Sequence, residues 1–146
     1  MKNRVIDSLQ PLLADYQVLY QKLRSFHWNV RGPLFFELHL KFEELYTDAA
    51  TKVDDLAERV LALGGRPLST LQSQLEAARL VENAGEADAS AMVRELVDDL
   101  AKLDGWLREG VRTAGEADDA ATVNMLEAMA DAQEKTRWML GAFLHA

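Results

Sequence analysis

The sequence contains no cysteine. This absence excludes disulfides, zinc–thiolate sites, iron–sulfur clusters and thiol nucleophiles, and it fits the reducing environment of the cytoplasm. Long apolar runs are also missing: no segment reaches the roughly 18 consecutive apolar residues of a membrane-spanning helix, and the N-terminal residues show no signal-peptide pattern. We therefore expect a cytoplasmic protein that does not associate with membranes.

Basic residues are in the minority, with 16 Lys and Arg against 24 Asp and Glu, so the formal net charge is −8. An acidic surface repels nucleic-acid phosphates but is compatible with attracting cations. Ahead of Asp7 the only basic residues are Lys2 and Arg4, which falls short of a Lys/Arg-rich tail. We expect DNA binding to be weak or absent.

Helix-breaking residues are scarce, with 3 prolines and 8 glycines. Pro11 lies near the start, and Pro33 and Pro67 follow glycine-containing turns. Between these breaks the apolar residues recur at helical spacing, and no strand pattern is found. The sequence predicts four long helices, the fourth after an N-cap at Asp119, and they carry the apolar rows Leu9–Val30, Leu38–Leu63, Val93–Val111 and Leu126–Phe143.

The connection between the second and third helices is long, from Gly65 to about Ala89, and includes a short predicted helix near Leu71–Leu80. Two helical hairpins joined by one long crossover are the ferritin-like arrangement of a four-helix bundle. The sequence therefore predicts an all-α fold in a single domain, residues 1–146, with a short helix in the crossover between helices 2 and 3.

The second predicted helix has two faces that look buried. With about 100° per residue, its apolar row faces the bundle. A charged face reads as solvated and consists of Lys41, Glu44, Asp48, Lys52, Asp55 and Arg59. The remaining sector combines small and apolar residues with four side chains that can bind metals, namely His39, Glu43, Asp54 and Glu58. Small residues let another helix approach closely, so we expect a partner subunit there.

These four side chains cannot meet in one chain, because His39 and Asp54 are about 22 Å apart along a helix. They meet if two copies of the helix pair antiparallel across a two-fold axis, which is a common contact in homo-oligomers. His27 joins them because the Gly32-Pro33 turn folds the first helix back beside the second. Two imidazoles and three carboxylates suit iron(II), with zinc or manganese as alternatives.

Simpler interpretations exist for each residue. Single histidines and acidic pairs are common on helices, and Asp54 and Glu58 could form salt bridges to a partner's Lys or Arg. No Glu lies three residues before any histidine, so the Glu-x-x-His pairs of a di-iron site inside a bundle are absent. His145 is expected to be solvated, and three tryptophans to lie in the core or in interfaces: Trp28, Trp106 and Trp138.

The stretches HWNVRGPLFFELHLKFEELY and VDDLAERVLALGGRPLSTL carry a resemblance that extends over the whole chain. The sequence resembles the Dps-like mini-ferritins, the DNA-protection-during-starvation proteins. The spacing of the histidines and acids is specific to the family's ferroxidase centre between subunits. The resemblance implies that this centre consists of His27, His39, Glu43, Asp54 and Glu58, with Trp28 beside it as an interceptor of radicals or electrons.

The resemblance also implies a function. Members of the family form hollow shells of twelve subunits, oxidise Fe(II) preferably with hydrogen peroxide, and store ferric mineral inside. Acidic residues near the start of the fourth helix line the pores through which iron enters, and here Asp118 and Asp119 lie near that region. Asn124 stands where many relatives have Asp. The competing hypotheses are a DNA-binding nucleoid-protection protein in the same shell and a purely structural helical oligomer.

Overall fold

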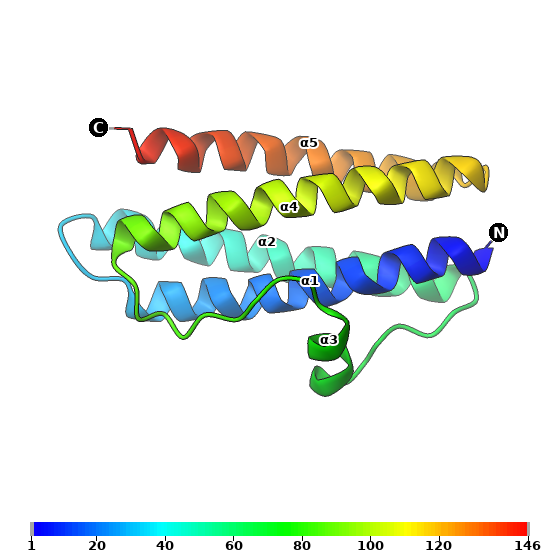
Figure 1. Cartoon of the computed structure of the whole chain (residues 1–146), viewed down its shortest axis with the longest axis horizontal. Helices are drawn as coiled ribbons and strands as arrows, with labels where there is room; N and C mark the ends of the chain where they lie inside the picture. Colours follow the sequence, from blue (N-terminus) through cyan, green and yellow to red (C-terminus); the bar gives the residue numbers. More distant parts are fainter. Residues whose placement is uncertain (1, 146) are drawn as a thin grey trace.

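The computed structural model describes residues 2–145, and in this range every regular element is a helix. This range contains four long helices and one short one, which are labelled in Figure 1. Their bounds are α1 Lys2–Asn29, α2 Phe35–Ala62, α3 Leu71–Ala77, α4 Ala89–Glu116 and α5 Ala120–Phe143. The all-α prediction and the short helix in the crossover are confirmed, although α3 ends at Ala77 rather than near Leu80.

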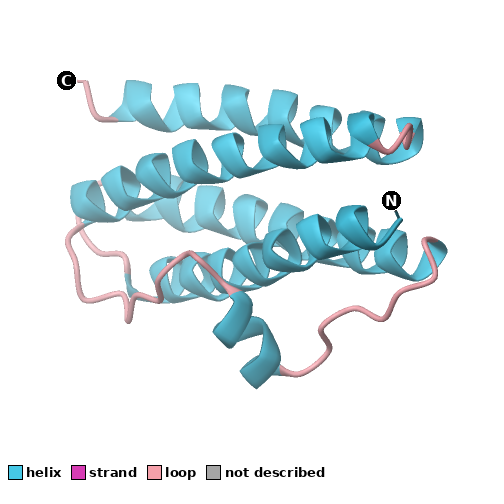
Figure 2. Cartoon of the chain, turned by 45° about the vertical axis from the view of Figure 1, so that its right-hand side comes forward, coloured by secondary structure: helices cyan, strands magenta, loops and turns pink. Residues whose placement is uncertain are grey.

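The four long helices form two hairpins, α1 with α2 and α4 with α5, that pack against each other (Figures 1 and 2). The crossover passes along the outside of α1, and α3 lies against that helix. The apolar rows of the four helices meet in one continuous core, whose largest fully buried side chains include Tyr16, Phe26, Phe42, Leu56, Met92, Leu103 and Leu107. None of the described helices is long and apolar enough to cross a membrane.

The helix ends follow from local sequence. Gly32 and Gly64, with φ of 117° and 89°, adopt backbone conformations that other residues rarely adopt, so they end α1 and α2 sharply. Asp119 is the N-cap of α5, as predicted, and its side chain accepts a hydrogen bond from the Thr122 backbone N–H. Asp88 caps α4 in the same way through the Ala91 N–H.

A buried carboxylate holds the crossover against α1. Asp15 is fully buried and accepts hydrogen bonds from the backbone N–H groups of Arg79 and Leu80. The Arg79 guanidinium also pairs with this carboxylate at 2.7 Å and lies 4.0 Å from the centre of the Trp106 ring. The chain after α3 is therefore fixed at one point by charge, hydrogen bonds and an aromatic ring.

Two expectations about the helices are wrong. Pro11 lies inside α1 and does not mark a break. A proline inside a helix costs about 3 kcal/mol, but Leu9, Leu12 and Leu13 around it are buried and their packing offsets this cost. Lys52 is buried rather than solvated, because it lies at the edge of the charged face that is nearest the core. Its ammonium group pairs with Asp48 and lies over the Tyr16 ring.

Candidate metal centre

The turn between α1 and α2 brings His27 and His39 into direct contact. Nδ1 of His27 is 2.7 Å from the backbone oxygen of His39, and Nδ1 of His39 is 2.7 Å from the backbone oxygen of His27. The two rings are stacked, with centroids 3.7 Å apart and planes inclined by 14°. The symmetric spacing about the Gly32-Pro33 turn thus produces a reciprocal pair of hydrogen bonds.

These bonds place a proton on Nδ1 of each ring. A backbone carbonyl can only accept a hydrogen bond, so each Nδ1 must carry the proton and donate. In the neutral imidazole, Nε2 then carries the lone pair, which is the form that binds a metal. Histidines that bind metals are typically oriented by a hydrogen bond of this kind from their other nitrogen. Both rings are therefore prepared as ligands within a single chain.

Further side chains support the two rings. Phe35 stacks on His39 at 4.8 Å between centroids, and the edge of Tyr46 meets His27 at 5.3 Å. The side chain of His27 is only 9% exposed, whereas that of Glu43 is 52% exposed. Oε1 of Glu43 lies 3.9 Å from Nε2 of His27, so one predicted carboxylate ligand is already beside the free nitrogen.

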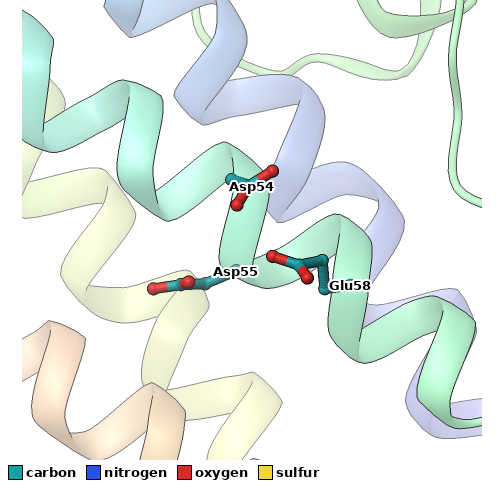
Figure 3. Close-up of side chains that lie close together, drawn as sticks. All are labelled: Asp54, Asp55 and Glu58. Carbon is teal, nitrogen blue, oxygen red and sulfur yellow. The ribbon is translucent and has the colours of Figure 1, made fainter.

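The remaining predicted ligands form a separate acidic cluster further along α2. Oxygen atoms of Asp54, Asp55 and Glu58 lie within 4.8 Å of one another on the exposed surface (Figure 3). A hydrogen bond with Asp54 and the negative charge of that residue raise the pKa of Glu58. A divalent cation between the two carboxyl groups would offset this repulsion.

Asp55 is exposed, as the helical wheel predicted, but its carboxylate also joins the acidic cluster, which the wheel did not indicate. The signal was its place directly after Asp54 in the motif VDDLAE. Within one chain the structure brings together His27, His39 and Glu43, and separately the acidic cluster. His39 and Asp54 are about 22 Å apart along α2, so one chain does not complete the five-residue site and that site stays a prediction.

The bundle interior offers no alternative site of this type. Among the described residues, the one group of three side chains able to share a metal is the exposed acidic cluster. A small cavity of about 20 Å³ does lie between all four long helices. Its polar groups are already paired: the Tyr16 hydroxyl donates to Gln133, and Lys52 donates to Asp48. Burial raises the pKa of Tyr16, which therefore stays a neutral phenol.

The acidic residues before α5 differ in availability. Both oxygens of Asp119 are occupied inside the chain, by the backbone and hydroxyl of Thr122 and by the Arg59 guanidinium. Burial tends to raise the pKa of Asp119, but these hydrogen bonds and the Arg59 charge outweigh it and hold the pKa below its usual value. Asp118 and Asn124 are exposed. Asp118 is therefore the freer carboxylate for incoming cations.

The predicted positions of the other aromatic and histidine residues are mixed. His145 is exposed, as expected. Trp28 and Trp138 are 57% and 69% exposed, so within one chain neither is a core residue. Trp106 is half-buried beneath Arg79. The Arg24 guanidinium lies 4.9 Å from the centre of the Trp28 ring, next to the histidine pair.

Comparison with known proteins gives consistent results. Residues 6–146 match the family model of the ferritin-like domain. The "DNA protection during starvation protein" of Brevibacillus brevis is 52% identical over 132 residues, which cover 90% of this chain and 89% of that protein. "General stress protein 20U" of Bacillus subtilis is 43% identical over 144 residues, covering 99% of both chains.

Solved structures show the same likeness. The crystal structure of a Dps protein from Bacillus brevis has a TM-score of 0.97 and 49% identity, over 99% of this chain and 97% of that one. The Dps protein from Vibrio cholerae, described as a member of a broad superfamily of ferritin-like diiron-carboxylate proteins, has a TM-score of 0.95 and 40% identity. It is matched over 90% of its length and 98% of this chain.

Proposed function

Because the chain belongs to the Dps-like mini-ferritins of the ferritin-like family, we propose that it stores iron and oxidises Fe(II) with hydrogen peroxide at sites between subunits. Family membership supports iron storage in general. The finer proposal concerns where the oxidation occurs and which residues bind the iron.

The observation that carries this proposal is the reciprocal hydrogen bonding of His27 and His39. These hydrogen bonds use Nδ1 of each ring and leave both Nε2 atoms available beside the turn between α1 and α2. The Glu43 carboxylate lies 3.9 Å from Nε2 of His27. The arrangement therefore favours metal binding over the purely structural interpretation.

The stacking of the rings supports a site for two ions. The lone pair of an imidazole nitrogen lies in the ring plane, and these planes are nearly parallel with ring centroids 3.7 Å apart. A cation in the plane of one ring lies outside the plane of the other. Each imidazole would therefore hold its own Fe(II), and carboxylates would complete and bridge the two coordination shells.

The acidic half of the site would come from a second chain. If two α2 helices pair antiparallel, His39 and Glu43 of one subunit face Asp54 and Glu58 of the other, and each pair of subunits has two sites. Asp55, the third member of the acidic cluster, is close enough to Asp54 and Glu58 to take part. Mixed nitrogen and oxygen ligands suit iron(II), and zinc or manganese would compete for the same atoms.

The chemistry assigns simple tasks to the protein. Two Fe(II) ions each give one electron to hydrogen peroxide, whose O–O bond breaks, and two protons complete two water molecules. The paired reduction avoids the release of hydroxyl radical. His27 and His39 hold the cations through Nε2, while Glu43, Asp54 and Glu58 stabilise the growing positive charge on the metals. We further propose that twelve cytoplasmic subunits form the storage shell.

Little supports DNA binding as the main function. The net charge is −8, and affinity for DNA depends on neutralising phosphates with basic residues. The relatives named for DNA protection do not change this charge balance. A clear shift of duplex DNA in a gel at about 150 mM salt without divalent metal would contradict our expectation, since that salt already weakens phosphate contacts strongly.

The test of the proposed site is a matched pair of variants. Mixing the protein anaerobically with Fe(II) and limiting peroxide, and following ferric absorbance, should show rapid oxidation for the parent protein. The double variant Asp54→Ala/Glu58→Ala should be slow, because two of the five ligands are gone. The control Glu37→Ala/Glu44→Ala removes two exposed carboxylates from another face of α2 and should behave like the parent. Equal rates for all three proteins would refute the site assignment.

A further inference from the structure

The outer face of α2 exposes apolar side chains at both of its ends. Phe36 is 80% exposed and Leu61 is 58% exposed, although both are large hydrophobic residues. With about 100° per residue they lie in the same sector as Glu43 and Asp54, in the middle of the predicted ligand face. Water contact at these positions is unfavourable, by roughly 25 cal/mol for each Å² of apolar surface.

The spacing of these two residues matches the register of the proposed metal sites. Phe36 lies three residues before His39, and Leu61 lies three residues after Glu58. In an antiparallel pair that sets His39 opposite Glu58, Phe36 therefore meets Leu61 of the partner subunit. The same register brings Leu40 opposite a small residue and leaves Thr47 and Ala50 at the centre, where the helices must approach closely.

From this coincidence of registers we infer that divalent cation binding and pairing of two chains are one linked equilibrium. The apolar contacts between Phe36 and Leu61 of the partner subunit set the register at both ends, and the cation joins the imidazole half of one chain to the acidic half of the other. The inference rests on the proposed function, since it uses the same sites. It adds that the cation is also the ligand that controls assembly.

The charges and geometry explain why neither half binds a cation well by itself. The imidazole half has two neutral nitrogens and one carboxylate, Glu43, and its stacked rings cannot chelate one ion together. The acidic half is exposed to water, where ion pairing is weak. Pairing supplies the missing ligands to each half and removes water from both.

The size of the linkage follows from mass action. A cation that binds only the paired state raises the association constant of the two chains. For each site the factor is 1 + L/Kd, where L is the free cation concentration and Kd is the dissociation constant of the cation. With two sites, a free cation concentration ten times the dissociation constant raises pairing about 100-fold. Linkage is reciprocal, so pairing strengthens cation binding by the same factor by which the cation strengthens pairing. A change that leaves the chains unpaired must therefore weaken cation binding.

Zinc(II) is the probe for this test, because it has no redox chemistry. Sedimentation is measured with zinc or with a chelator, at the urea concentration where half of the metal-free chains are unpaired. We expect zinc to restore pairing in the parent protein. The variant Phe36→Glu should pair poorly and bind zinc at least 10-fold more weakly, although Phe36 offers no ligand atom. Trp138→Glu, an equally exposed aromatic residue on α5, should keep the parent's zinc affinity.

A charge-swap experiment tests the register itself. Phe36→Glu combined with Leu61→Glu places like charges at both contacts, whereas Phe36→Lys combined with Leu61→Glu places opposite charges there. Only the second combination should recover zinc-dependent pairing. All four changes lie on the exposed surface of the chain, and circular dichroism checks that each variant is folded.

Three results would overturn the inference: no effect of zinc on pairing, parent-like zinc affinity in unpaired Phe36→Glu, or equal behaviour of the two charge combinations. These outcomes are separate from failure of the proposed function. If iron oxidation still depends on Asp54 and Glu58 while zinc leaves pairing unchanged, the ferroxidase site stands and only the linkage is wrong. If the Asp54→Ala/Glu58→Ala variant oxidises iron normally, the proposed function itself is wrong.

Discussion

Replacing His27 by Phe keeps an aromatic ring beside the turn between α1 and α2 but removes both ring nitrogens. The Phe ring can still stack on His39, so most of the packing is retained. The backbone oxygen of His39 loses this second hydrogen bond but, as an interior carbonyl of α2, keeps its helical partner. The loss of one such hydrogen bond costs about 0.5–1.5 kcal/mol, and the free energy of unfolding should fall by that amount.

The effect on metal binding should be sharper. His39 donates to the backbone oxygen of residue 27, which any substitution there retains, so the His39 ring stays oriented. Each ring is expected to hold its own ion, so His27→Phe should halve the number of zinc ions bound. The remaining ion should keep its affinity, because the roughly 10- to 100-fold loss that follows from a disturbed supporting hydrogen bond does not apply to His39. His39→Phe should give the same result.

Titration of zinc against a coloured chelator, with Trp28→Phe as the control beside the site, measures both the number of ions and their affinity. Loss of all binding in the His27→Phe variant would show that the two imidazoles serve a single ion. An unchanged number of ions would show that His27 is not a ligand. Either result refutes the separate-ion reasoning from the stacked rings.

Three other predictions concern stability. Asp15→Ala should lower the free energy of unfolding by about 1–3 kcal/mol, because it leaves the backbone N–H groups of Arg79 and Leu80 without their acceptor. The Arg79 guanidinium is 34% exposed and can turn to water, so its charge adds little to the cost. Urea denaturation that shows less than about 1 kcal/mol would contradict the role of this carboxylate. Lys52→Met should change stability by less than about 1.5 kcal/mol in the same assay, since the apolar stem is replaced and Asp48 can turn to water. The pKa of the Asp119 carboxyl group is lower in the folded chain than in the unfolded one. The ionised carboxylate therefore stabilises the fold at pH values above the ordinary Asp pKa, and this stabilisation is lost as the pH falls through the pKa of the folded chain. Asp119→Asn should therefore be less stable than the parent at pH 7, and the difference should shrink below about pH 4, where unfolded aspartates become protonated; a constant difference would point to the cap hydrogen bonds alone.

Much of the architecture could be predicted from the sequence because the glycine-containing turns that interrupt the apolar spacing stand at real helix boundaries. Gly32 and Gly64 end two helices, and the apolar spacing between them fixes the face of α2 that enters the core. Pro11 shows the limit of this reasoning. A local rule marks it as a break, but buried neighbours on both sides keep α1 continuous.

The candidate site was only partly visible in the sequence. Helical spacing places His39, Glu43, Asp54 and Glu58 on one face, since this needs only the repeat of the helix. The mutual hydrogen bonds of the histidines depend on the exact path of the turn, which no periodicity encodes. The burial of Lys52 and the use of Asp119 by Arg59 depend in the same way on side chains from other helices.

The exposed side chains at the two ends of α2 affect how mutational data on this protein should be interpreted. A screen that reports folding of the single chain would find Phe36 and Leu61 free to vary, because neither contributes to the core of its own bundle. A screen that reports survival under iron load would find the same positions intolerant. Positions that tolerate substitution in the folding screen but not in the survival screen would therefore map the surface through which one subunit contacts another, without any structure of the assembly.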